Sequence, residues 1–115
     1  NIKAPGPGVA SYSVAKAGLQ QLARVATMEL APVGIRVNTV HPDAVFDTGV
    51  WTDDILTARA AKYNMSVDAY KKRNLLKASI TSNDVARTIF LLVGPDMPAT
   101  TGGHVSIDGG NERTV

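Results

Sequence analysis

The longest apolar pattern in the chain runs from about residue 11 to residue 31 and predicts an α-helix. Its apolar positions recur every three or four residues, which places them on one helical face; they are Ala15, Leu19, Leu22, Ala26 and Leu30. Ser11 is the expected N-cap, and Pro32 followed by Gly34 is expected to end the helix.

A second face of the same helix is also largely apolar. It carries Val14, Gly18, Gln21, Val25 and Met28. A helix that is apolar on two sides has to be covered on both sides. We expect one cover from a sheet and the other from a neighbouring helix, either in this chain or in a second subunit.

Two short segments rich in β-branched residues predict strands. Residues 35–41 (IRVNTVH) end at Pro42, and residues 104–108 (HVSID) run into two glycines. Strands separated by helices favour parallel pairing and an α/β architecture. Two strands alone form a marginal sheet, so we expect part of the domain to lie outside this chain.

Three further helices are expected between the strands. The first covers residues 51–63 with Thr52 as its cap, and the second covers residues 66–76 and begins at Ser66. Ser82 is expected to cap the third, which ends at a Gly-Pro pair. The inner face of the third helix is expected to consist of Val85, Ile89, Leu92 and Val93.

Composition narrows the functional classes. The chain has 115 residues, no cysteine, a net charge of +2, and 44% hydrophobic residues. It is too apolar for a disordered chain, has no apolar run long enough to span a membrane, and has no thiol for a disulfide or metal site. The small charge surplus does not indicate a nucleic-acid partner. No targeting segment is visible, so we expect a cytoplasmic protein.

Tyr12 and Lys16 form the one pair that indicates chemistry. They are four residues apart at the start of the long helix, so they share a helix face. A fixed ammonium group and the positive end of the helix dipole both favour a phenolate, and they would lower the pKa of the tyrosine. Such a tyrosine suits proton exchange with an alcohol or a carbonyl. The same spacing also occurs by chance on helices with no catalytic role.

Three stretches in order carry a family resemblance. Residues 11–18 (SYSVAKAG), 29–38 (ELAPVGIRVN) and 101–110 (TGGHVSIDGG) together resemble the C-terminal half of the short-chain dehydrogenase/reductase family. The resemblance implies a doubly wound Rossmann-type parallel sheet and hydride transfer between NAD or NADP and an alcohol/carbonyl pair. It assigns Tyr12 as the general acid/base and Lys16 as the residue that tunes it and binds the nicotinamide ribose. The alternative is a non-catalytic module of the same fold that serves assembly.

The residues after the first expected strand resemble the family's nicotinamide turn. Pro42 matches, and Val45 fits the aliphatic position whose backbone contacts the cofactor, while Asp43 stands in place of the usual glycine. Asp tolerates a left-handed backbone, so the turn is expected to survive. Thr48 is displaced by one position, which argues against a phosphate contact. The run from His41 to Val45 resembles the dehydrogenase part of bifunctional rhamnulose-1-phosphate aldolase/lactaldehyde dehydrogenases.

The resemblance also implies that one half of the domain is missing. No glycine-rich nucleotide loop occurs, residues 6–8 read as an active-site loop, and the family's catalytic serine would precede Asn1. We therefore expect residues 1–115 to be the catalytic and substrate-lid half of one domain, with the lid at residues 47–78. Expected partners are the missing half, a small alcohol or carbonyl substrate, and further copies in a dimer or tetramer.

Other residues favour structural roles. His41 and His104 are single histidines without carboxylates at metal-ligand spacing, so no metal site is expected. A basic run, Lys71 to Arg73, favours a solvated helix face over a phosphate site. The aromatic and sulfur side chains of residues 47–78 favour packing at least as much as pocket lining; they are Trp51, Tyr63, Met65 and Tyr70.

Overall fold

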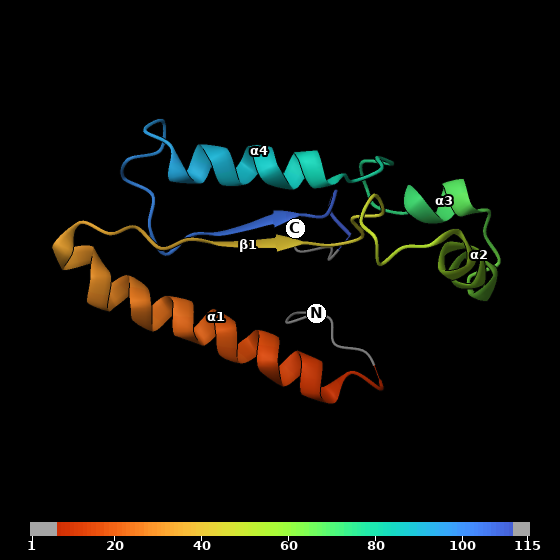
Figure 1. The fold of residues 1–115 in the computed structure, drawn as a ribbon, viewed down its shortest axis with the longest axis horizontal. Helices are drawn as coiled ribbons and strands as arrows, with labels where there is room; N and C mark the ends of the chain where they lie inside the picture. The colour runs from red at the N-terminus through yellow and green to blue at the C-terminus, as the bar shows by residue number, and fades with distance from the viewer. Residues whose placement is uncertain (1–6, 112–115) are drawn as a thin grey trace. The chain divides into compact units, whose positions relative to one another are not determined.

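The computed structural model describes residues 7–111 (Figure 1). In chain order the elements are α1 (Ala10–Leu30), η1 (Ala31–Val33), β1 (Thr39–Pro42), α2 (Asp53–Lys62), α3 (Val67–Lys71), α4 (Ser82–Val93) and β2 (His104–Ile107). The chain divides into two compact units, each described by itself. The first unit comprises residues 1–39 with 91–105, and the second comprises residues 40–90 with 106–115.

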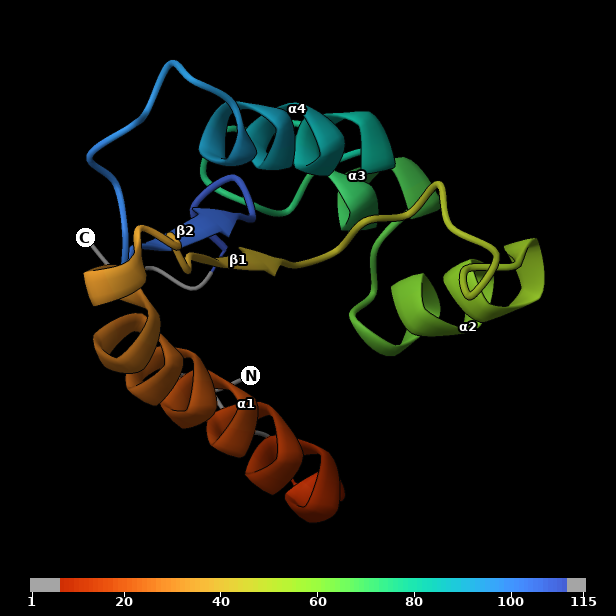
Figure 2. The same ribbon diagram turned by 60° about the vertical axis from the view of Figure 1, so that its left-hand side comes forward.

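The two strands pair in parallel, as expected for an α/β fold. The N–H of Thr39 donates to the carbonyl of Gly103 at 2.9 Å, and the N–H of Asp43 donates to that of Ile107 at 3.2 Å. The donor and acceptor residues are separated by the same number of positions in both bonds, so the two strands advance in the same direction, as in a parallel pair. Both arrows point the same way in Figures 1 and 2. The α/β prediction is therefore confirmed.

The long helix of the first unit begins earlier than expected. The N-cap of α1 is Val9, which makes no side-chain cap bond, and Ser11 lies inside the first turn, so the prediction that Ser11 caps the helix is wrong. The expected stop is confirmed: Gly34 takes a left-handed φ of 79° and donates its N–H to Ala31 O. None of the residues of α1 is buried within this chain.

The strand expected over residues 35–41 starts only at Thr39. Before Thr39, a side-chain hydrogen bond takes the place of regular backbone pairing between strands. The N–H of Val37 donates to Thr101 Oγ1 at 3.0 Å, and the N–H of Gly102 donates to Val37 O at 2.7 Å. Residues 35–38 are thus held in place by the loop before β2 without forming regular strand structure.

Two residues of the GIRVN stretch hold that loop. The guanidinium of Arg36 donates to the carbonyls of Thr100 at 3.1 Å and Gly94 at 3.3 Å. The carboxamide of Asn38 donates to Thr100 O at 2.9 Å and accepts from the N–H of Gly103 at 3.0 Å. These side chains satisfy backbone groups that a longer ladder would otherwise pair.

The second unit contains α2 and α3, which contact each other (Figure 2). Both expected caps are confirmed: Thr52 Oγ1 accepts from Ile55 N–H at 3.4 Å, and Ser66 Oγ accepts from Ala69 N–H at 3.2 Å. The second of these helices was expected to reach residue 76, but α3 ends at Lys71.

The last helix is capped one residue earlier than expected. Thr81 Oγ1 accepts from the N–H of Asp84 at 3.3 Å, while the carboxylate of Asp84 accepts from the N–H of Thr81 at 2.8 Å. This reciprocal pair is a capping box, so Ser82 is not the cap. The inner face is only partly as expected, since Leu92 is buried but Val93 is 71% exposed.

The buried core of the second unit is aromatic and aliphatic. Phe46, Leu56, Ala60 and Tyr70 form it, and Trp51 packs against it. Within residues 7–111, no helix is both long and apolar enough to cross a membrane.

Candidate functional site

The first turns of α1 bring Tyr12 and Lys16 together. Lys16 Nζ lies 5.5 Å from the centroid of the Tyr12 ring, so the ammonium group sits beside the ring. The ring of Tyr12 is 52% exposed, and Lys16 is exposed as well. The sequence expectation that the two side chains share a face is confirmed.

Both groups are available to a ligand. Within residues 7–111, no ion pair or hydrogen bond engages the ammonium of Lys16 or the hydroxyl of Tyr12. The first turn of α1 carries no acidic side chain, so the positive end of the helix dipole is not neutralised there. A phenol and an ammonium that no other residue of the described range 7–111 engages therefore lie together in the exposed first turns of α1.

The middle and end of α1 contact the start of β2 and the loop before it. Gln20 Nε2 lies 3.4 Å from His104 Nδ1. A Cβ added to Gly102, which has a φ of 71°, would lie 3.3 Å from Thr27 Cγ2. These contacts hold the helix that carries the pair, and His104 takes part in packing and hydrogen bonding as expected.

The predicted cofactor residues Pro42 and Val45 lie at the end of β1 and in the following turn. The left-handed position of this turn is Ala44, with a φ of 56°, and not Asp43, which corrects the expectation for Asp43. Thr48 Oγ1 donates to the carbonyl of Val45 at 3.2 Å. Thr48 therefore closes the turn.

The 47–78 segment is built around an aromatic cluster. Phe46 lies edge-on to Trp51 with ring centroids 5.0 Å apart and is 5.7 Å from the ring of Tyr70. Tyr63 stacks on Tyr70 with centroids 5.7 Å apart. Tyr70 is buried, whereas Tyr63 is 49% exposed. Packing thus accounts for most of the aromatic side chains of this segment.

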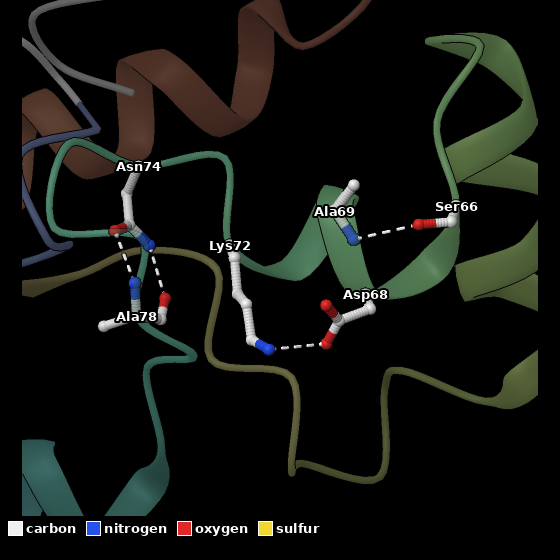
Figure 3. A network of polar contacts seen from close by, with 6 residues as sticks. All are labelled: Ser66, Asp68, Ala69, Lys72, Asn74 and Ala78. Carbon is white, nitrogen blue, oxygen red and sulfur yellow. Dashed lines mark hydrogen bonds and ion pairs between the residues drawn. The ribbon is translucent and has the colours of Figure 1, made fainter.

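Sequence reasoning missed the role of Arg73. Its guanidinium lies 4.8 Å from the centroid of Tyr70 and 5.5 Å from that of Tyr63, which is a cation–π geometry. The sequence carries no direct signal for this contact, because Arg73 lies beyond the end of α3 at Lys71. Its neighbour Lys72 follows the expectation of a solvated face and pairs with Asp68 at 2.8 Å (Figure 3).

The beginning and end of the 47–78 segment are joined by Asp47. Its carboxylate accepts from Ser82 Oγ at 2.7 Å and from Ser82 N–H at 2.8 Å. These bonds, the side-chain bond first, hold the pKa of Asp47 below its ordinary value. The Thr81 hydroxyl and N–H likewise lower the pKa of the Asp84 carboxyl.

The turn after β2 packs against residues 74–78. Asn74 is buried, and its carboxamide both donates to Ala78 O at 2.6 Å and accepts from Ala78 N–H at 3.1 Å (Figure 3). A Cβ on Gly109 would lie 2.6 Å from the carboxamide of Asn74. Gly110 is also left-handed, with a φ of 81°. The structural role expected for this glycine pair is confirmed.

The predicted site residues fall into two groups. Tyr12 and Lys16 belong to the first unit, and Pro42 and Val45 belong to the second. Within residues 7–111, no group of three or more His, Asp or Glu side chains is arranged to hold a metal ion.

Comparison with known proteins bears on this arrangement. Residues 2–112 match the family profile described as "Enoyl-(Acyl carrier protein) reductase". A solved structure that is 31% identical to the chain is described as an oxidoreductase of the short-chain dehydrogenase/reductase family. This chain belongs to the short-chain dehydrogenase/reductase family. Its α/β fold is that of the Rossmann-type structures of the family.

Individual relatives cover nearly the whole chain. An uncharacterized oxidoreductase of Bacillus subtilis, YuxG, is 36% identical over 91% of the chain. A short-chain oxidoreductase from Pseudomonas aeruginosa PAO1, solved with NADPH bound and described as containing an atypical catalytic center, superposes over 96% of the chain with a TM-score of 0.76 and 30% identity. A Burkholderia thailandensis oxidoreductase of this family gives a TM-score of 0.71 and 31% identity over 94% of the chain.

The chain is shorter than each of these relatives. It spans 16% of YuxG, 42% of the Pseudomonas structure and 39% of the Burkholderia structure.

Proposed function

We propose that the protein carrying this chain is an NAD(P)-dependent oxidoreductase that interconverts an alcohol and a carbonyl compound. The observation that carries the proposal is the Lys16 ammonium, 5.5 Å from the centroid of the exposed Tyr12 ring in the first turns of α1, with neither polar group engaged by residues 7–111. Family membership and a 30%-identical relative solved with NADPH support it.

Tyr12 and Lys16 act differently in this proposal. Tyr12 donates a proton to the substrate oxygen in reduction and accepts it in oxidation. Lys16 hydrogen-bonds the ribose hydroxyls of the dinucleotide and places its ammonium beside the Tyr12 ring. The dinucleotide supplies or accepts the hydride when bound. The turn of Pro42 and Val45 holds the nicotinamide end, and the 47–78 segment acts as the substrate lid.

The residues present fit such a cofactor. The ammonium of Lys16 is exposed and has no partner within residues 7–111, so it can donate to ligand hydroxyls. Val45 lies just beyond the carboxyl end of a parallel strand, and ligands of open α/β sheets bind outside these ends.

Substitution of Tyr12 tests the activity. In the full-length protein, Tyr12→Phe should lower kcat with NADH or NADPH by about 10²–10⁴-fold across a panel of alcohols and carbonyls, because the proton donor is lost. Dinucleotide binding, followed by fluorescence titration, should persist in this variant.

Lys16→Met should weaken dinucleotide binding as well as lower kcat, since Lys16 has both roles. Arg24→Met is the matched control, because Arg24 is an exposed cation on the same helix that bonds only Gln21 among the described residues. If the intact protein binds the dinucleotide and Tyr12→Phe leaves every activity unchanged, the non-catalytic assembly module becomes the better interpretation.

We further propose that the chain is the catalytic and lid half of its domain. Its span of 42% of the NADPH-bound relative supports this. Its span of only 16% of YuxG is in line with a longer parent, which we propose carries an aldolase upstream of the dehydrogenase.

Two measurements test this proposal. The isolated 115-residue chain should not bind NADH or NADPH in the micromolar range, whereas the full-length protein should. Intact-mass analysis against the encoded open reading frame should reveal a longer parent; a reading frame that encodes this chain alone would contradict the proposal.

A further inference from the structure

The turns that follow β1 and β2 are joined by hydrogen bonds. Nδ2 of Asn111 donates to Oδ2 of Asp43. The N–H of Asp43 donates to the carbonyl of Ile107 at 3.2 Å. Asp43 is therefore attached to the end of β2 through its backbone and to the turn after β2 through its side chain. We call this pair of side chains, Asp43 and Asn111, the turn latch.

The turn that carries Asn111 is itself fixed. Asp108 is 7% exposed, and its Oδ1 accepts from the N–H of Gly110 at 2.9 Å. The N–H of Asn111 donates to Asp108 O at 3.1 Å. Gly109 packs closely on Asn74, because a Cβ added to Gly109 would lie 2.6 Å from the carboxamide of Asn74. Asn111 is thus a donor held at a set position.

The turn that carries Asp43 needs such support. The residue after Asp43 is Ala44, whose φ of 56° lies in the left-handed region that alanine disfavours. Such backbone persists only where the surrounding structure imposes it. On one side the buried Phe46 anchors the turn in the aromatic cluster, and on the other side the turn latch anchors it. Val45 lies between the two anchors.

We propose that Asp43 and Asn111 are positioning residues, which set the backbone of Val45 against the nicotinamide end of the dinucleotide. This inference rests on the proposed function. A glycine at position 43, which the family resemblance leads one to expect, would have no side chain to accept the bond from Asn111. Asp43 therefore replaces the conformational freedom of glycine with an attachment to the neighbouring strand, while Ala44 takes the left-handed conformation.

The test uses the full-length protein with NADH and NADPH as probes. Asp43→Ala and Asn111→Ala should each raise the Kd and KM for the dinucleotide by about three- to tenfold, the size expected when a partly exposed hydrogen bond to a charged group is lost. The KM for the alcohol or carbonyl at saturating dinucleotide should change less. The double variant should be no worse than the more damaging single one, because both remove the same contact.

Exchanging the donor and acceptor side chains of Asp43 and Asn111 tests whether the lost affinity can be restored. Asn111→Asp places two carboxylates together and should raise the dinucleotide Kd more than Asn111→Ala does. Asp43→Asn combined with Asn111→Asp restores one donor and one acceptor, and should recover most of the lost affinity. This reciprocal variant also keeps the test decisive if a single variant folds poorly.

Asp68→Ala is the matched control. It removes an exposed carboxylate of the same unit, whose partner is Lys72 (Figure 3), and should leave the dinucleotide Kd unchanged. Two results would overturn the inference while leaving the proposed function in place: an unchanged dinucleotide KM in both single variants, or a lower melting temperature with unchanged KM below that temperature. A wild-type protein that binds no dinucleotide would overturn the proposed function and this inference together.

Discussion

Single residues of this chain are constrained most where the backbone is left-handed. Ala44 and Gly109 both have positive φ, but for different reasons. Ala44 is held there by its neighbours in the turn, whereas Gly109 has no room for a side chain. At this scale the sequence predicted that a turn follows Pro42, but placed the left-handed position at Asp43. The bonds from Asp43 to β2 could not be inferred, because they depend on a residue far along the chain.

Gly109→Ala should destabilise the protein. The substitution forces alanine into left-handed backbone and places its Cβ 2.6 Å from the carboxamide of Asn74, which together should cost about 2–4 kcal/mol. Urea unfolding measures this cost. Gly49→Ala is the control, because no atom lies within 4 Å of that Cβ and its φ is ordinary; an equal loss in both variants would show that the contact is unimportant.

Arg73→Met should lower the free energy of unfolding by about 1 kcal/mol, because the cation above the rings of Tyr63 and Tyr70 is lost. Limited proteolysis should also cut faster within residues 53–72. Lys72→Met removes the adjacent cation, which takes part only in an exposed ion pair, and should change stability by less than about 0.5 kcal/mol. Equal effects at the two positions would contradict a specific role for Arg73.

At the scale of elements, helix positions followed from local sequence better than strand lengths did. The caps at Thr52 and Ser66 are bonds between residues three apart, so a short window of sequence contains all that they require. The cap of α4 was misplaced although the T-x-x-D pattern of residues 81–84 indicated it. The length of the first strand was overestimated. The N–H of Val37 bonds the side chain of Thr101, a distant partner that the hydrophobic pattern cannot reveal. The aromatic cluster likewise joins residues that are distant in sequence.

The bond between Asp47 and Ser82 predicts a pH dependence of stability. The folded-state pKa of Asp47 is lowered, so its contribution is present above the ordinary carboxyl pKa of about 4 and is lost as pH falls through the folded value. The difference in unfolding free energy between wild type and Asp47→Asn should therefore be largest near neutral pH and shrink below about pH 4. Urea unfolding at several pH values measures this difference.

Ser82→Ala serves as the companion variant. It removes the hydroxyl that is the largest cause of the lowered pKa of Asp47. The difference in unfolding free energy between Ser82→Ala and the double variant Ser82→Ala/Asp47→Asn should therefore depend less on pH than the difference between wild type and Asp47→Asn. If the difference in unfolding free energy between wild type and Asp47→Asn is the same at all pH values, the bond does not act through the charge of Asp47.

For the whole molecule, the main feature is that the apolar side chains of α1 are not buried by the rest of the described residues. Val14, Leu22 and Met28 of α1 are 74%, 62% and 73% exposed. The sequence predicted two apolar faces and two covers, and neither face is buried within this chain. The sequence of residues 7–111 does not show what covers these two faces. We propose that the rest of the domain and a second copy of the protein supply them.

The isolated chain should therefore bind a hydrophobic dye such as 8-anilinonaphthalene-1-sulfonate, and the full-length protein should bind much less. In the full-length protein, Val14→Glu with Met28→Glu should shift the mass measured by light scattering from a dimer or tetramer toward the monomer. Asn83→Glu, at an exposed position of α4, should leave the mass unchanged. A full-length wild type that is already monomeric would contradict the proposed second copy.

The bond from Asp47 to Ser82 also bears on how this protein can change in evolution. The two residues close residues 48–81 into a loop whose ends are held together, and lengthening a closed loop adds little entropic cost. Insertions or deletions between these two residues would leave the strand ends where they are if the packing around Phe46 is kept. Residues 74–76 also limit the exchange, since Asn74 lies against Gly109 and the N–H of Leu76 donates to Gly109 O at 3.1 Å. If residues 47–78 form the proposed substrate lid, substrate preference can diverge inside this boundary while the proposed hydride-transfer chemistry stays the same.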